Sequence, residues 1–309
     1  MSTTSSEEYR KRFFTSQDGL RLSFRDYGDP LSEKTPLLCL GGLTRNASDF
    51  HDLAGWLRND RRILAPDYRG RGRSEYDPNW RNYHPRVYLN DIRHLLATTG
   101  VHRVVVLGTS LGGILAMAMG AAMPTALAGV ILNDVGPDIH APGLARILAY
   151  ICKDRPQPNW KTAAKHLETL MPALSITTAA GWEALAHRTY REGADGALHF
   201  DWDINIAKPL QSPQQPPQAL WPFYRAIRHL PVLAFRGELS DILTVKTFER
   251  MATEKPDLVR VTVMGCGHVP LLDEPPATAA IEHFLNRCDP DRCDPDRRDP
   301  DRRDRESKT

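Results

Sequence analysis

Short apolar runs alternate along the chain with segments whose apolar residues recur at helical spacing. The run 103–107 contains three consecutive valines and is therefore apolar on both faces, as in a parallel strand covered by helices on both sides. Segment 48–58 instead places Phe50, Leu53 and Leu57 on one face of a helix. We expect strands at 12–16, 20–27, 36–40, 62–65, 103–107, 128–132, 231–235 and 258–264, and helices at 48–58, 85–99, 111–123, 245–253 and 276–285. The pattern predicts an α/β fold with a mostly parallel, eight-stranded sheet.

Two segments do not follow this alternation. Segment 138–228 is rich in Pro and Trp, has short helical patterns at 143–152 and 160–170, and contains no strong strand pattern. It is predicted to be a helical insertion after the sixth strand. Segment 288–309 repeats CDPDR-like units, in which proline blocks a helix and nothing apolar can be buried, so we expect it to be disordered. The expected organisation is a core (1–137 and 229–287), a helical cap (138–228) and a tail (288–309).

Composition narrows the class of protein. The 309 residues are 41% hydrophobic and 25% charged, and the 40 Lys and Arg nearly balance the 38 Asp and Glu, so neither nucleic acid nor an anionic membrane is an expected partner. The longest apolar run, 111–123, is shorter than the roughly 18–20 residues that span a bilayer. Five scattered cysteines do not suggest a disulfide framework. A cytoplasmic location is expected, and the oligomeric state is left open.

The strongest chemical motif is Gly108-Thr109-Ser110-Leu111-Gly112, between a predicted strand and a predicted helix. This G-x-S-x-G pattern is typical of a nucleophile elbow, in which the chain reverses so sharply that the residues flanking the serine by two positions must lack a β-carbon. The serine oxygen is then exposed beside a helix N-terminus. Ser110 is the predicted nucleophile.

A serine nucleophile requires a base and an acid, and both are expected at the same edge of the sheet. His268 follows the last predicted strand and is the predicted base. Asp241, in the loop after strand 231–235, is the preferred acid. The rivals are Asp134 after strand 128–132, Glu238 in the same loop as Asp241, and Asp273 near the histidine.

The oxyanion that forms during acyl transfer needs backbone donors. We expect the N–H of Leu111, directly after the serine, and the N–H of Leu43, in the Gly41-Gly42-Leu43 loop after strand 36–40. No H-E-x-x-H motif, paired C-x-x-C motif, P-loop or dinucleotide fingerprint is present in the sequence, so neither a metal nor a cofactor is expected.

From about residue 12 to 287 the chain resembles the α/β-hydrolase superfamily, in the branch with a helical cap inserted after the sixth core strand. The resemblance rests on the elbow, on 67–74 (DYRGRGRS), which matches the D-x-R-G-x-G-x-S loop of that branch, and on Gly267-His268 followed by Asp-Glu-Pro. The loop 67–74 is mainly a structural wall in such relatives. One departure is Gly41-Gly42, where relatives usually have His-Gly.

The resemblance implies a serine hydrolase that cleaves a carboxylic ester or lactone of a small, largely apolar substrate through an acyl-enzyme. Haloalkane dehalogenases and epoxide hydrolases of this fold use an aspartate nucleophile, whereas position 110 is Ser. Hydrolysis of a C–C bond, or acyl transfer by the same triad, is the alternative reaction. A non-catalytic binding protein on the same fold is a further alternative.

Overall fold

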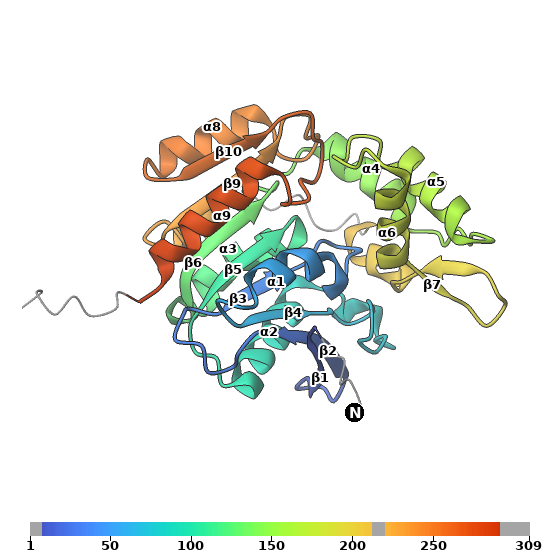
Figure 1. The fold of residues 1–309 in the computed structure, drawn as a ribbon, viewed down its shortest axis with the longest axis horizontal. Helices are drawn as coiled ribbons and strands as arrows, with labels where there is room; N and C mark the ends of the chain where they lie inside the picture. Colours follow the sequence, from blue (N-terminus) through green and yellow to red (C-terminus); the bar gives the residue numbers. More distant parts are fainter. Residues whose placement is uncertain (1–7, 212–219, 291–309) are drawn as a thin grey trace, which may run out of the picture.

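An eight-stranded sheet crosses the molecule in the computed structural model, which describes residues 8–211 and 220–290 (Figure 1). The order across the sheet is β1-β2-β4-β3-β5-β6-β9-β10, and every neighbouring pair is parallel except those that involve β2. The strands are β1 (Arg10–Thr15), β2 (Arg21–Tyr27), β3 (Leu37–Leu40), β4 (Ile63–Pro66), β5 (Val104–Thr109), β6 (Leu127–Asn133), β9 (Val232–Gly237) and β10 (Val259–Val263). The predicted fold class is confirmed.

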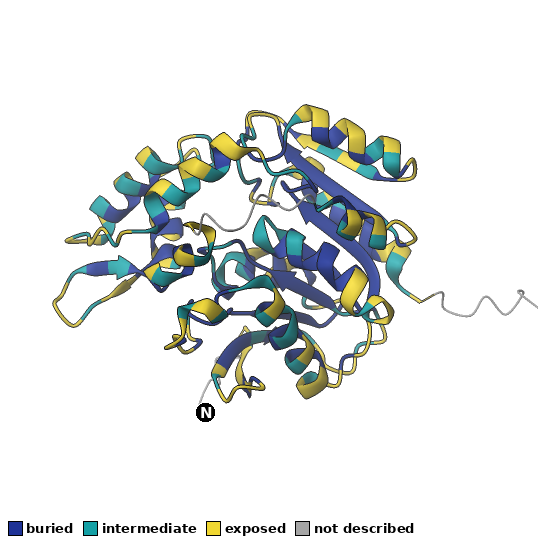
Figure 2. Cartoon of the chain, turned by 180° about the vertical axis from the view of Figure 1, so that it is seen from behind, coloured by how far each residue is buried: buried dark blue, intermediate teal, exposed yellow. Residues whose placement is uncertain are grey.

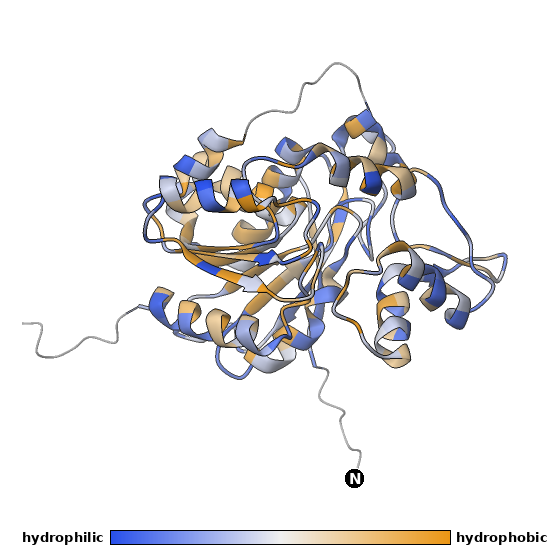
Figure 3. Cartoon of the chain, turned by 90° about the horizontal axis from the view of Figure 1, so that it is seen from above, coloured by the Kyte–Doolittle hydropathy of each residue, from blue (hydrophilic) through white to orange (hydrophobic). Residues whose placement is uncertain are grey.

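Helices cover both faces of this sheet, which explains why its central strands are apolar on both sides. Val104 and Val106 of β5 belong to one buried cluster, whereas Val105 and Leu107 belong to a second. The first cluster includes residues of α2 (Pro85–Thr99), α3 (Leu111–Ala122), α7 (Trp221–Ala226) and α8 (Val245–Glu254), and the second includes residues of α1 (His51–Leu57) and α9 (Pro275–Cys288). Figure 2 shows the buried strands between helices whose outer faces are exposed, and in Figure 3 the strands are largely hydrophobic.

The segment between β6 and β9 lies at one end of the sheet, where α4 to α6 and a small hairpin form a separate group (Figure 1). It contains α4 (Ala141–Ile151), α5 (Trp160–Leu170), α6 (Ala179–Thr189), β7 (Tyr190–Glu192), β8 (Leu198–Phe200), the 3₁₀ helix η4 (Ile204–Gln211) and α7. The helices expected near 143–152 and 160–170 are confirmed. The hairpin was not expected, because strands of three residues are too short to leave a pattern. The last helix, α7, returns to pack on α3.

The insertion is fastened to the core through the loop 67–74. Arg71 and Trp202 form an isolated β-bridge, and the Asp203 N–H donates to the Gly70 carbonyl over 2.8 Å. The loop that resembles a structural wall in related hydrolases therefore also makes backbone contacts between the core and the insertion.

The C-terminal boundary differs from the expected one. The predicted tail begins at residue 288, but α9 includes Cys288, and Asp289 forms an ion pair with the buried Arg61 (2.8 Å). The Cys288 carbonyl also accepts a hydrogen bond from the Thr35 hydroxyl (2.9 Å). These contacts attach 288–289 to the core, whereas 291–309 lies outside the described residues. Within the described ranges, no helix is long and apolar enough to cross a membrane.

Candidate active site

Ser110 sits at the sharp turn between β5 and α3. Its backbone has φ 52° and ψ −113°, a region that residues with a side chain rarely adopt. A β-carbon added at Gly108 would lie 2.3 Å from the Gly112 carbonyl oxygen, and one added at Gly112 would lie 2.0 Å from the Leu40 carbonyl oxygen. Both glycines are therefore required by close backbone approach, as the motif predicts.

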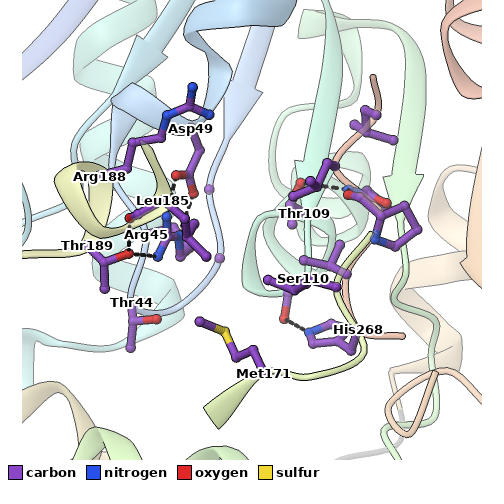
Figure 4. A pocket seen from close by; sticks show the side chains of 18 of the residues that line it. Thr44, Arg45, Asp49, Thr109, Ser110, Met171, Leu185, Arg188, Thr189 and His268 are labelled. Atoms are coloured by element: carbon purple, nitrogen blue, oxygen red, sulfur yellow. Dashed lines mark hydrogen bonds and ion pairs between the residues drawn. The ribbon is translucent and has the colours of Figure 1, made fainter. Parts of the chain in front are cut away.

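Ser110, His268 and Asp134 form a continuous chain of hydrogen-bonded side chains. Nε2 of His268 lies 3.1 Å from Oγ of Ser110, and its Nδ1 lies 2.7 Å from Oδ2 of Asp134 (Figure 4 shows the Ser110–His268 contact). Asp134 also accepts hydrogen bonds from the Gly237 N–H (2.8 Å) and the Ser240 hydroxyl (2.6 Å). This is the geometry of a nucleophile, a base and an acid that orients the base.

The structure corrects the expected acid, because Asp134 rather than Asp241 contacts the histidine. The Asp241 carboxylate forms a bidentate pair with Arg146 of α4 (2.6 and 3.0 Å), and this hydrogen-bonded cation lowers the pKa of the Asp241 carboxyl. Asp134 follows β6 directly and reaches His268, whereas Asp241 lies further along its loop and faces the insertion. Glu238 accepts a hydrogen bond from a backbone N–H over 2.7 Å, and no bond to His268 is found among the described residues.

The two expected oxyanion donors flank the serine. Among the described residues, neither the Leu43 N–H nor the Leu111 N–H donates to another protein group. The loop that carries Leu43 is held from behind, because the Tyr68 hydroxyl donates to the Gly41 carbonyl (3.2 Å) and Nε of Arg71 donates to the Leu43 carbonyl (2.8 Å). The arginine-rich loop 67–74 thus also orients the predicted oxyanion loop.

A cavity of about 290 Å³ opens in front of Ser110 and His268. Most of its wall is apolar and comes from both the core and the insertion: Leu43, Phe50, Leu53, Trp56, Ile147, Tyr150, Leu167, Leu170, Met171, Leu174, Leu185, Trp202, Val269, Leu271 and Leu272. Charged residues line it as well: Arg45, Asp49, Asp52, Arg188 and Asp273. Of the four tryptophans of the insertion, Trp202 lines the cavity. The others do not: Trp182 and Trp221 are buried, and Trp160 stacks on His187 with ring centroids 3.8 Å apart.

Asn133 is a site residue that the sequence analysis missed. Its side chain is buried, and its Nδ2 donates to the Thr109 hydroxyl (3.2 Å) and to the Pro270 carbonyl (3.0 Å). It therefore links the segment before Ser110 to the segment after His268. Its position at the end of β6 is the only sequence signal that could have suggested it.

Cys266 lies two residues before the histidine but is buried, and burial raises the pKa of its thiol to about 12. The thiol is therefore protonated at neutral pH and behaves as a small apolar group. In residues 8–211 and 220–290, no group of three or more His, Cys, Asp or Glu side chains has the arrangement of a metal site.

Comparison with known proteins agrees with this fold. A sequence profile described as "Alpha/beta hydrolase family" matches residues 37–281, and the chain belongs to this family. It is 30% identical over 273 residues to 3-hydroxybutyrate-oligomer hydrolase of Cupriavidus necator, covering 86% of this chain and 92% of that protein. It is 26% identical to 2-(acetamidomethylene)succinate hydrolase of Mesorhizobium japonicum, covering 75% and 81%.

Solved structures give the same result. An alpha/beta hydrolase from Novosphingobium aromaticivorans superposes with a TM-score of 0.86 at 43% identity, covering 92% of this chain and all of that one. The structure of E-2-(acetamidomethylene)succinate hydrolase superposes with a TM-score of 0.77 at 25% identity, covering 90% and 99%. The protein is therefore an α/β hydrolase, and the two relatives described above are named as hydrolases.

Proposed function

We propose that this protein is a serine hydrolase that cleaves carboxylic esters or lactones of small, largely apolar substrates through an acyl-enzyme. The observation that carries the proposal is the contact of His268 with Ser110 on one side and with Asp134 on the other, at the wall of a mostly apolar cavity. The named relative that acts on 3-hydroxybutyrate oligomers supports ester cleavage.

In the proposed mechanism, Oγ of Ser110 attacks the substrate carbonyl carbon while Nε2 of His268 takes the hydroxyl proton. Asp134 keeps the other ring proton on Nδ1 and stabilises the imidazolium. The N–H groups of Leu43 and Leu111 donate to the oxyanion of the tetrahedral intermediate. His268 then protonates the leaving alcohol, and water hydrolyses the acyl-enzyme with the same histidine as the base.

The test is turnover of p-nitrophenyl butyrate together with labelling by a fluorophosphonate. Ser110→Ala should lower kcat by up to ~10⁶-fold and abolish labelling without changing the melting temperature, because the serine oxygen makes no packing contact that the fold needs. Turnover of the variant within tenfold of the parent would refute the nucleophile assignment. A parent protein that is neither labelled nor active would favour the binding-protein alternative.

A reaction on another acyl bond is the second candidate, and the similarity to 2-(acetamidomethylene)succinate hydrolase favours testing it. A panel of dienol diketo acids, acyl acceptors and simple esters, assayed with the parent and Ser110→Ala, separates C–C hydrolysis and acyl transfer from ester hydrolysis. A cytoplasmic location stays a prediction.

A further inference from the structure

Arg45 provides a fixed polar corner in the otherwise apolar cavity. Its Nε and Nη2 donate to the two carboxylate oxygens of Asp49 (2.6 and 2.5 Å), and its Nη1 donates to the Thr189 hydroxyl (2.7 Å). All three residues line the cavity, and Figure 4 shows them together on the wall opposite Ser110 and His268. Asp49 lies in the 3₁₀ helix η1 (Ala47–Phe50) of the core, just after Arg45, whereas Thr189 ends α6 of the insertion.

The Arg45 guanidinium is not fully used by these partners. A guanidinium has five N–H groups, and Asp49 and Thr189 accept three of them. One N–H on each of Nη1 and Nη2 has no acceptor among the described residues. The side chain is only 16% exposed, so a substrate atom in the cavity is the partner best placed to accept them.

Gly42 of the oxyanion loop lies between the stem of Arg45 and the side chain of Ser110. A β-carbon added at Gly42 would be 3.8 Å from Cβ of Ser110 and 3.3 Å from Cγ of Arg45, so both side chains border the same point of the oxyanion loop. Since Ser110 and Arg45 line the same cavity, an acyl group attached to Oγ of Ser110 that extends into the cavity can approach the Arg45 side chain.

The charges around the cavity determine which kind of atom fits there. Asp49 neutralises Arg45, and Asp52 pairs with Arg188 over 2.7 Å, which leaves Asp273 without an arginine partner. No positive charge is in excess on this wall. A carboxylate on the acyl chain of the substrate would therefore be repelled by the nearby aspartates. A neutral hydroxyl or carbonyl oxygen can instead accept hydrogen bonds from the remaining N–H groups without adding charge.

We propose that Arg45 recognises a neutral oxygen on the acyl chain, so that the substrates are esters of hydroxyacyl or oxoacyl groups rather than of plain alkanoyl groups or dicarboxylic acids. This inference rests on the proposed function only in that the substrate is an ester held at Ser110. Asp49 and Thr189 act by positioning the guanidinium.

The kinetic test compares p-nitrophenyl esters of butyrate, 3-hydroxybutyrate and succinate, each kcat/KM being divided by the rate constant for uncatalysed alkaline hydrolysis. The parent should prefer the hydroxy ester over butyrate by about tenfold or more, the usual size of one hydrogen bond to a charged group, and should prefer butyrate over the succinate monoester. In Arg45→Met combined with Asp49→Asn, which removes the donors without leaving an unpaired carboxylate, the first preference should fall to within about twofold of unity.

The matched control is Arg225→Met combined with Glu254→Gln, which removes a similar bidentate pair (2.8 and 2.9 Å) outside the cavity and should leave the parent's preference unchanged. A parent without preference for the hydroxy ester, or a preference that survives the loss of Arg45, would overturn the proposal. Preference for the succinate monoester would do the same.

A binding measurement separates this inference from the proposed function. Calorimetry with Ser110→Ala should give about tenfold tighter binding of methyl 3-hydroxybutyrate than of methyl butyrate, and the Arg45→Met, Asp49→Asn changes should remove the difference. Equal binding of both esters overturns the inference even if turnover is observed. Preferential binding without any turnover that depends on Ser110 supports the inference and refutes the proposed reaction.

Discussion

Asp134 accepts three hydrogen bonds, and each of them restricts where its carboxylate can lie. Two of these hydrogen bonds come from the Gly237 N–H of the neighbouring strand β9 and from the Ser240 hydroxyl in the loop after it. The third joins the carboxylate to Nδ1 of His268. Asp134 also has φ 52°, an uncommon value for a residue with a side chain. A carboxylate fixed in this way can hold the imidazole in one orientation throughout the reaction.

Replacement of Asp134 by Asn should therefore lower kcat for p-nitrophenyl butyrate near pH 7 by up to ~10⁴-fold, because the amide can favour the wrong tautomer and cannot offset the imidazolium charge. Asp241→Asn is the matched control. It breaks only the partly exposed pair with Arg146 and should retain activity within a few-fold. The reverse result, an inactive Asp241→Asn and an active Asp134→Asn, would show that the acid is Asp241.

Asn133→Ala should reduce kcat by up to ~100-fold with little change in KM, since it frees the elbow and the histidine loop to shift relative to each other. Thr109→Val, which removes only one of the two acceptors of Asn133, should cost less. Steady-state kinetics on both variants, with melting temperatures as the control for folding, test this prediction. An Asn133→Ala variant that changes KM alone would argue for a substrate contact instead.

The contact between Ser110 and His268 could be predicted from local sequence patterns, whereas the carboxylate that contacts His268 could not. The elbow is recognised from five consecutive residues, because its sharp turn requires both flanking glycines. His268 is recognised because it follows the last predicted strand, at the same edge of the sheet. Asp134 and Asp241 both follow strands at the same edge, and the choice between them depends on the reach of two side chains across β6 and β9 and on the presence of Arg146. Arg146 belongs to the insertion, and the periodicity of its helices does not show which side chains point towards the core.

At the scale of elements, the cavity wall is shared between α1 of the core and helices of the insertion. Trp56 on α1 lines the cavity although it is 41% exposed, so it contacts substrate space without being part of the core. Of the four tryptophans that make the insertion rich in aromatic residues, three do not line the cavity. Composition indicates that a segment is apolar, but not which of its rings faces the serine.

Trp56→Ala should flatten the dependence of kcat/KM on acyl length, measured from p-nitrophenyl acetate to octanoate, by at least about threefold, because part of the apolar wall is lost. Trp160→Ala, which removes a ring that does not line the cavity, is the control and should keep the parent profile. Identical profiles for Trp56→Ala and the parent would show that long chains occupy another wall.

The contact between the loop 67–74 and the insertion contains a pH-dependent group. Burial, together with the nearby Asp67 carboxylate, raises the pKa of Asp201 to about 6. The folded protein therefore binds this proton more tightly than the unfolded chain does between about pH 4 and pH 6. The resulting stabilisation is present below this window and is lost as the pH rises through 6.

Asp201→Asn removes the charge at every pH, so its melting temperature should exceed that of the parent by several degrees above pH 7 and should lose that advantage near pH 4. Thermal unfolding followed by circular dichroism between pH 4 and 8 tests this. Glu183→Gln, at an exposed position on α6, is the control and should shift the curve equally at all pH values. An Asp201→Asn curve parallel to that of the parent would contradict the assignment.

At the scale of the whole molecule, the end of α9 is attached to the core by an ion pair between Asp289 and Arg61. The Arg61 guanidinium is buried and donates to Asp289 (2.8 and 3.0 Å) and to the Thr35 carbonyl (2.9 Å). This contact could not be predicted from the sequence, because Asp289 belongs to the same charged repeat as the residues that follow it. Charge periodicity alone does not distinguish an aspartate that pairs with a buried arginine from one in solvent.

Asp289→Ala should destabilise the protein by about 3 kcal/mol and lower the melting temperature by several degrees, since it leaves the buried guanidinium with only the longer contact to Asp60 (3.4 Å) as an ion pair. Deletion of 291–309, which retains the ion pair, should change the melting temperature by less than about 2 °C. Differential scanning calorimetry compares the two variants. A deletion as harmful as Asp289→Ala would mean that the residues after 290 also stabilise the core.

The backbone of Ser110 has an evolutionary consequence. At φ 52° and ψ −113° a glycine would have a lower conformational energy than a serine, because it has no β-carbon. The serine at this position therefore reduces the stability of the fold. A descendant released from selection for hydrolysis would gain stability by exchanging Ser110 for glycine. It could not exchange Gly108 or Gly112, because a β-carbon at either would collide with the backbone. In such a lineage the backbone conformation of the turn would be conserved after the nucleophile had been lost.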